Sequence, residues 1–199
     1  MAKKSIRILG LDPGKTNFGI SVTEFNAAGT SYKPLYAGKL KNTITDMSQL
    51  VAHMDHFNDE LGLLLEYKPQ LVVIERFMNR GSFSGDQGEY VGCMLSLAAY
   101  QARANCGSAI QIVQPGVWKQ AFNRVLGWKA KDPKPTPLDK LYKYCLTESH
   151  ELDAFLMTHF GHSLLTGTPY FSLIRSKPKS VFLAEFEAVA TGKKKRKRL

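Results

Sequence analysis

The sequence is poor in cysteine and has no long apolar run. Its three cysteines, Cys93, Cys106 and Cys145, lie far apart and form no CxxC pair. This spacing argues against a disulfide framework or a zinc knuckle and favours a reducing compartment. No apolar run is long enough to cross a bilayer. Arg7 and Asp12 interrupt the apolar stretch near the N-terminus, which therefore lacks the pattern of a signal peptide. We expect a cytoplasmic protein without membrane contact.

Complete nucleotide-binding motifs are also missing. Lys15 and Thr16 follow Pro13-Gly14, but the GxxxxGK[ST] spacing of a phosphate-binding loop is absent. An apolar strand, Asp12-Pro13-Gly14 and then Gly19 would satisfy the first phosphate loop of actin-like and sugar kinases. Such kinases need a second glycine-rich loop and a much longer chain. We therefore expect no nucleotide cofactor.

The positive charge of the chain is concentrated at its C-terminus. The formal net charge is +10, but residues 193–198 are six consecutive lysines and arginines, and without them the charge is +4. We expect residues 1–170 to form one folded domain and residues 171–199 a C-terminal extension that ends in a disordered basic arm. The arm fits three roles: a solubility tail, a contact with the phosphate backbone of DNA, or a nuclear targeting signal.

Hydrophobic periodicity predicts an α/β domain with a mixed sheet. Three strands are expected first, at residues 6–11, 18–25 and 32–40, and the short connection between the first two indicates an antiparallel pair. A helix over 46–67, a strand over 71–74, a helix over 85–104 and a strand over 109–113 follow. The remaining expected helices are 117–126, 138–146 and 149–165. This order of elements is typical of a layered α/β fold.

Four residues form a candidate catalytic set. Asp12 and Glu75 come at the ends of predicted core strands, where a carboxylate needs compensation for its desolvation. His150 and Asp153 are three positions apart on a predicted helix and share a face. Oxygen and imidazole ligands suit Mg²⁺ or Mn²⁺, and two such ions can hold a scissile phosphate between them.

Each member of this set also has a simpler explanation. Asp12 precedes Pro-Gly and could be a turn residue. Glu75 could form a surface salt bridge with Arg76 or Arg80. His150 and Asp153 could belong to an exposed helix face that Ser149 caps. The combination of all four at element ends is more specific than any one residue.

Three segments of the chain resemble the RuvC Holliday-junction resolvases. The first is ILGLDPG at residues 8–14, followed by Gly19; the second is VIERFM at 73–78; the third is SHELDA at 149–154. The spacing between these segments also fits that family, over about residues 5–165. Leu152 departs from the family pattern, which usually has alanine before the last aspartate.

The resemblance implies an RNase H-like fold, a mixed five-stranded sheet flanked by helices. It implies that Asp12, Glu75 and Asp153 bind metal, and that His150 is a further ligand or positions the water. It also implies two Mg²⁺ ions per site, which Mn²⁺ can replace, a homodimer, and cleavage of four-way DNA junctions to leave 5′ phosphates. Two other functions stay open: a nuclease for flaps or other branched DNA, and a catalytically silent DNA-binding module.

Candidate DNA contacts lie in a basic segment rich in aromatic residues. Lys119, Arg124, Lys129 and Lys131 could line a groove for the phosphate backbone. Lys119 also resembles a family lysine that contacts DNA. The alternative is a solvated loop whose two tryptophans belong to the core.

Aromatic side chains could also stack on an opened junction. The family has an aromatic wedge three places after its second acidic residue; here Met78 holds that place and Phe77 precedes it. Phe83 and Tyr90 are further candidates for stacking. Packing in the protein core is the alternative for all of them.

Two weaker patterns accompany these motifs. The pairs His53/His56 and His159/His162 could each supply two zinc ligands, but no third ligand is evident, so we expect surface histidines. Gly88, Gly92 and Ser96 form a small-residue stripe through which two copies could pair.

Overall fold

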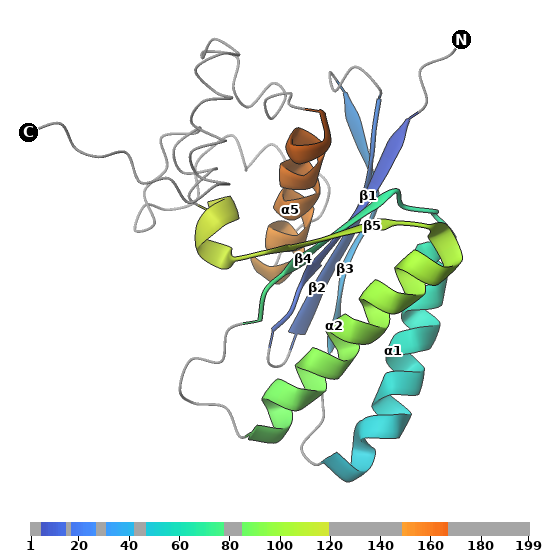
Figure 1. Ribbon diagram of the computed structural model, residues 1–199, viewed down its shortest axis with the longest axis vertical. Helices are drawn as coiled ribbons and strands as arrows, with labels where there is room; N and C mark the ends of the chain where they lie inside the picture. The colour runs from blue at the N-terminus through green and yellow to red at the C-terminus, as the bar shows by residue number, and fades with distance from the viewer. Residues whose placement is uncertain are drawn as a thin grey trace, which may run out of the picture.

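The computed structural model describes residues 5–14, 17–26, 31–41, 47–77, 85–119 and 149–166. A five-stranded sheet runs through the centre (Figure 1). Its strands are β1 (Ile6–Asp12), β2 (Asn17–Phe25), β3 (Tyr32–Lys41), β4 (Leu71–Glu75) and β5 (Ala109–Val113). The order across the sheet is β3-β2-β1-β4-β5. β2 pairs antiparallel with β1 and β3, whereas β4 runs parallel to β1 and β5. The predicted mixed sheet of an RNase H-like fold is confirmed.

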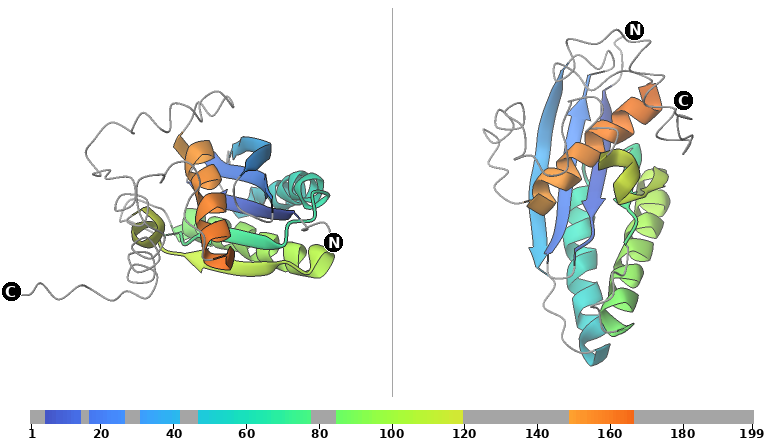
Figure 2. Two further views of the ribbon diagram at one scale, coloured as in Figure 1. Left: turned by 90° about the horizontal axis from the view of Figure 1, so that it is seen from above. Right: turned by 90° about the vertical axis from the view of Figure 1, so that its left-hand side faces the viewer.

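Helices cover both faces of this sheet. The short 3₁₀ helix η1 (Met47–Gln49) leads into α1 (Leu50–Leu65), which packs beside α2 (Gly85–Cys106) on one face. α5 (Ser149–Thr166) lies across the other face, against β1, β2 and β4 (Figures 1 and 2). In the described residues, no helix is both long and apolar enough to span a membrane.

Strand alternation divides the core between these two layers. Ile8 of β1 and Leu71 and Val73 of β4 belong to the cluster beneath α5. Leu9 of β1 and Val72 of β4 belong to the cluster beneath α1 and α2. Because successive side chains point to opposite faces of a sheet, the parity of a residue in these strands decides which helix it meets.

The predicted elements agree with the structure apart from their ends. β1 and β4 each extend one residue further than expected and so include Asp12 and Glu75 as their last residues. The helix expected at 117 begins at residue 115, where the missing N–H of Pro115 costs nothing in a first helical turn. That helix is described only as far as residue 119, and the predicted helix over 138–146 and the extension over 171–199 lie outside the described residues.

The expectation that His159 and His162 lie on the surface is wrong. Both are buried, with exposed fractions of 0% and 1%. The reason is that α5 is buried almost all round from Ala154 to Ser163, so its sequence has little of the polar face that marks a surface helix. His56, by contrast, is exposed on α1.

Candidate active site

Strand parity places the two strand-end carboxylates on the face that α5 covers. Ile8 and Gly10 of β1 stand opposite Leu71 and Val73 of β4, and the last recorded pair is Leu11 with Ile74. Asp12 and Glu75 occupy the next position along this register. They share the parity of Ile8 and Leu71, so both carboxylates turn toward α5 at the same edge of the sheet.

Two glycines let the first turns of α5 approach these strand ends closely. A β-carbon at Gly10 would collide with the carbonyl oxygen of Ala154, and one at Gly19 would collide with that of His150. The helix therefore lies directly on the backbones of β1 and β2. This contact brings His150 and Asp153, one turn apart on α5, over the carboxyl ends of β1 and β4.

Asp12 and His150 form the first pair of the site. His150 Nδ1 lies 2.7 Å from Asp12 Oδ2, and Asp12 is only 4% exposed. The hydrogen bond to Asp12 raises the pKa of the imidazole; burial opposes this, and the charges of Asp12 and Asp153 add to it. Because the Asp12 carboxylate accepts a hydrogen bond from Nδ1–H, Nε2 of the neutral ring carries the lone pair. Nε2 can therefore bind a cation or accept a proton.

Glu75 is a buried carboxylate with a raised pKa. Burial raises its pKa to about 6; the charges of Asp12 and Asp153 raise it too, while Lys119 and a hydrogen bond from Trp118 act in the opposite direction. The hydrogen bond comes from the indole: Trp118 Nε1 donates to Glu75 Oε2 over 2.6 Å. Within the described residues, Glu75 therefore has partners 43 and 44 positions away, whereas Arg80, one of the two expected salt-bridge partners, lies outside the described residues.

Lys119 connects the second pair of acidic residues. Its Nζ lies 2.9 Å from Asp153 Oδ2 and 3.7 Å from Glu75 Oε2. Burial lowers the pKa of this ammonium, but the charges of Asp153 and Glu75 outweigh burial, so the pKa stands above its ordinary value. Lys119 therefore lies inside the acidic site as a permanent cation, beside the carboxylates that it partly neutralises.

The donor set fits a hard divalent cation. Three carboxylates and one imidazole lie around this edge of the sheet. Burial first, and then the charges of Asp12 and Asp153, raise the pKa of Glu75 even though Lys119 lowers it. Oxygen-rich sets of this kind are typical of Mg²⁺ and Mn²⁺ sites. Within the described ranges, no three histidine, cysteine or acidic side chains already converge as a finished metal cluster. Instead, His150 pairs with Asp12, and Lys119 lies between Asp153 and Glu75.

The other predicted DNA-contacting and stacking residues lie either in the core or outside the described residues. Tyr90 is buried in the core beneath α1 and α2, as the packing alternative predicts, and the half-buried Phe77 packs against the same cluster. Met78, Phe83, Arg124, Lys129 and Lys131 lie outside the described residues.

Trp118 is a site residue whose role in holding an acidic side chain the sequence analysis missed. Of the two alternatives given for the tryptophans of the basic segment, a DNA-binding groove or the core, the structure places Trp118 in the core at 0% exposure. The signal for this role in the sequence was the position of Trp118, directly before Lys119 and shortly after β5, the strand beside β4.

Comparisons with known proteins find similarity to RuvC in both sequence and fold. No family model matches the chain. The crossover junction endodeoxyribonuclease RuvC of Corynebacterium glutamicum is 28% identical over 126 residues, which cover 62% of this chain and 53% of that protein. Among solved structures, Thermus thermophilus RuvC gives a TM-score of 0.58 at 20% identity and covers 81% of this chain and 97% of its own. The same protein in complex with a Holliday junction substrate gives 0.56 at 20% identity, covering 80% and 96%.

The chain resembles RuvC in sequence and in fold. Its resemblance in three short segments is matched by similarity over much of the chain, and its fold is that of RuvC. The chain spans about half the length of the curated RuvC relatives that it matches. The four candidate residues sit on β1, β4 and α5, so the three RuvC-like segments of the sequence meet at one edge of the sheet.

Proposed function

We propose that this protein is a divalent-metal-dependent DNA endonuclease that resolves four-way junctions. The observation that carries the proposal is that Asp12 and Glu75 end β1 and β4 at one edge of the sheet, where His150 pairs with Asp12 and Lys119 lies between Asp153 and Glu75. The similarity to RuvC, a crossover junction endodeoxyribonuclease, supports DNA as the substrate and the junction as the preferred structure. The products would be nicked strands with 5′ phosphates.

The residues of the chain have separable roles in this proposal. Asp12, Glu75 and Asp153 would hold the cations, and His150 would add its Nε2 as a ligand or proton acceptor. Two Mg²⁺ or Mn²⁺ ions bound there would supply Lewis-acid stabilisation of the charge that develops during phosphodiester hydrolysis. Lys119 lies between Glu75 and Asp153 and brings a fixed positive charge to the place where the scissile phosphate would bind.

Further DNA contacts are proposed in the basic segment. Arg124, Lys129 and Lys131 would follow the phosphate backbone away from the cleavage site, since side chains of this type bind DNA without reading its sequence. Phe77 and Met78 come two and three residues after Glu75; Met78 and the exposed part of the half-buried Phe77 would face the opened junction. The basic arm at 193–198 would add backbone affinity.

The test compares three labelled substrates, a four-way junction, a flap and a linear duplex, with Mg²⁺, Mn²⁺ or a chelator. We expect paired symmetric nicks in the junction that need a divalent cation. Asp12→Asn and Asp153→Asn should lower the cleavage rate at least 100-fold, because each removes a charged ligand. Asp59→Asn, at an exposed position on α1, is the matched control and should cleave normally.

Other results of the same assay would redirect the proposal. Equal cutting of flaps and duplex would leave a nuclease without junction preference. Tight junction binding without cutting under any metal condition would indicate the silent DNA-binding module and contradict the proposed activity.

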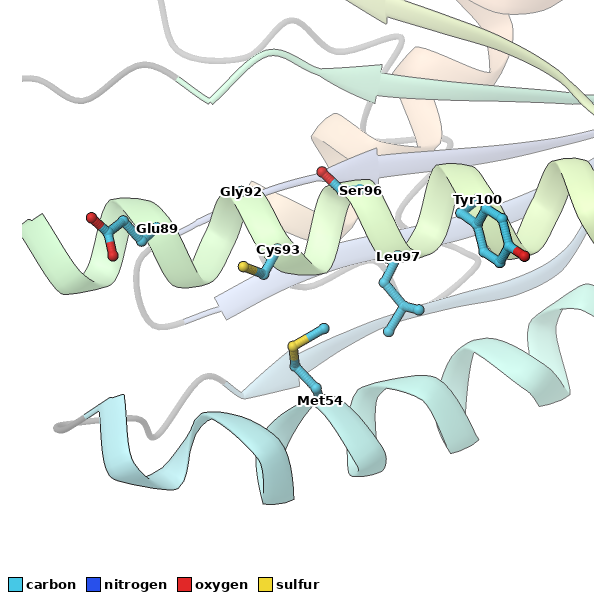
Figure 3. A pocket seen from close by; sticks show the side chains of 7 residues that line it. All are labelled: Met54, Glu89, Gly92, Cys93, Ser96, Leu97 and Tyr100. Carbon is cyan, nitrogen blue, oxygen red and sulfur yellow. The ribbon is translucent and has the colours of Figure 1, made fainter.

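We also propose that two copies pair through α2. Gly88, Gly92 and Ser96 line an exposed hollow beside β4 and β5, and the last two also line a second hollow toward α1. Figure 3 shows this second hollow, where Met54 of α1 points toward Leu97 of α2. A four-way junction has two strands to cut, so a two-fold symmetric pair would present one site to each.

A further inference from the structure

The geometry around Glu75 depends on one buried side chain, Trp118. The residue lies in the helical segment 115–119 that follows β5, and its side chain is fully buried in the core beneath α5. Its indole N–H, the one hydrogen-bond donor of the side chain, points out of this apolar core to Glu75 Oε2 at 2.6 Å. A close-packed ring of this size cannot turn without disturbing its neighbours, so the direction of the N–H is fixed.

The distances separate the roles of Trp118 and Lys119. Both reach the same oxygen, Glu75 Oε2, but Lys119 Nζ is 3.7 Å away, beyond hydrogen-bond length, and lies closer to Asp153 at 2.9 Å. The indole therefore fixes the Glu75 carboxylate, whereas Lys119 contributes mainly charge. The ammonium also lies 4.8 Å from the centre of the Trp118 ring, a cation–π distance, so the same ring supports both groups.

We propose that Trp118 is a positioning residue that orients the Glu75 carboxylate for a divalent cation. The indole uses one acceptor position of Oε2, which leaves Oε1 and the other lone pair of Oε2 for the ion. Partners that orient a ligand are worth about tenfold or more in metal affinity, because an unrestrained carboxylate loses its rotational freedom when it binds. The inference rests on the proposed function in one respect, the divalent cation.

The test removes the N–H and keeps the ring. Tryptophan can be replaced during expression by β-(benzothien-3-yl)alanine, in which sulfur takes the place of the indole nitrogen. Because the chain has a second tryptophan, Trp128, the parent is the full chain with Trp128→Phe. Trp118→Phe is the genetic counterpart, and the benzothienyl protein covers the case in which the smaller ring disturbs folding.

Two readouts separate positioning from structure. The first is Mn²⁺ binding by calorimetry without DNA; the second is the Mn²⁺ concentration that gives half-maximal junction cleavage. The Mn²⁺ dissociation constant and the half-maximal Mn²⁺ concentration should both rise about tenfold in the benzothienyl protein. Junction affinity measured in chelator and the unfolding midpoint should match the parent.

Each result decides the inference. Mn²⁺ affinity within twofold of the parent would overturn the role of Trp118, and a parent that binds no Mn²⁺ would overturn both this role and the proposed function. A parent that binds Mn²⁺ but cuts no branched DNA would contradict the proposed nuclease activity. The calorimetric comparison would still test whether Trp118 positions Glu75 for the metal.

Discussion

His159 and His162 are set apart from the candidate site by their apolar surroundings. His159 packs edge-on against Tyr32, Phe25 and Phe155 at centroid distances of 4.6–5.2 Å, and His162 stacks on Phe25 at 4.5 Å. Burial lowers the pKa of His159 to about 3 and that of His162 to about 4. Both rings are therefore neutral in the folded protein at pH values where they would be charged in the unfolded chain.

This difference predicts that stability falls as the solution is acidified below about pH 6.5. Between the folded pKa values and the ordinary value of 6.5, the unfolded chain binds more protons, so the free energy of unfolding decreases as pH falls. The loss is about 2 kcal/mol for each histidine at pH 5. Urea unfolding at pH 7.5, 6.5, 5.5 and 5 measures it.

A double substitution assigns the effect to these two rings. His159→Leu with His162→Phe should flatten the decrease between pH 6.5 and 5, whereas His56→Gln, at an exposed histidine, should leave it unchanged. A curve of the same steepness in the double variant would contradict the assignment. His150 acts in the opposite sense, because its raised pKa gives stability that is lost as pH rises.

Single residues show where sequence reasoning about the site succeeded and where it stopped. Asp12 and Glu75 could be found because a carboxylate directly after an apolar strand is unusual, and the structure places both at the end of a core strand. The hydrogen bond from Trp118 to Glu75 could not be found, because it joins residues 43 positions apart through a register that only the folded sheet defines.

The contact of α5 with the sheet determines whether the two halves of the site meet. β1 and β4 carry Asp12 and Glu75, and α5 carries His150 and Asp153. Gly10 lies in the middle of this contact: a β-carbon there would collide with the backbone oxygen of Ala154 and lie 3.0 Å from Thr158 Cγ2. A backbone atom cannot move aside as a side chain can, so the helix would have to shift.

We therefore expect Gly10→Ala to destabilise the protein by about 1–3 kcal/mol, the usual cost of an overpacked core. The shift of α5 should also separate His150 from Asp12 and lower junction cleavage. Urea unfolding at pH 7.5 measures the first effect. Gly62→Ala, on α1 with open space around its β-carbon, is the matched control and should be neutral or stabilising. Equal stability of the two variants would show that α5 does not depend on this contact.

At the scale of elements, the sequence predicted the order and type of the described strands and helices, because their hydrophobic patterns are long and regular. It could not predict which face α5 covers. That choice follows from strand parity, with Ile8 and Leu71 on one face and Leu9 and Val72 on the other, and from the glycines that permit close packing. The prediction for the histidines of α5 was wrong because α5 is buried almost all round from Ala154 to Ser163.

At the scale of the whole molecule, α2 and β5 carry exposed apolar side chains in the described residues, at the place of the proposed pairing. Tyr100 on α2 is 69% exposed and Ile112 on β5 is 61% exposed. Gly92 and Ser96 line both hollows; Tyr100 lines the one toward α1, and Ile112 lines the one beside β4 and β5. Exposed apolar patches of this kind are typical of interaction surfaces. Small residues at the centre of the face would allow two helices to approach closely.

A single glycine can test this pairing without harming the fold. Gly92 has no atom within 4 Å of its would-be β-carbon, so Gly92→Gln fits the isolated protomer but places a long polar side chain in the proposed contact. Gly62→Gln makes the same change on α1, also in open space. At micromolar concentration, sedimentation equilibrium should give dimers for the parent and for Gly62→Gln, and monomers for Gly92→Gln. If pairing supplies the second active site, Gly92→Gln should also nick only one strand of the junction at a time. A monomeric parent, or a dimeric Gly92→Gln variant, would move the contact elsewhere.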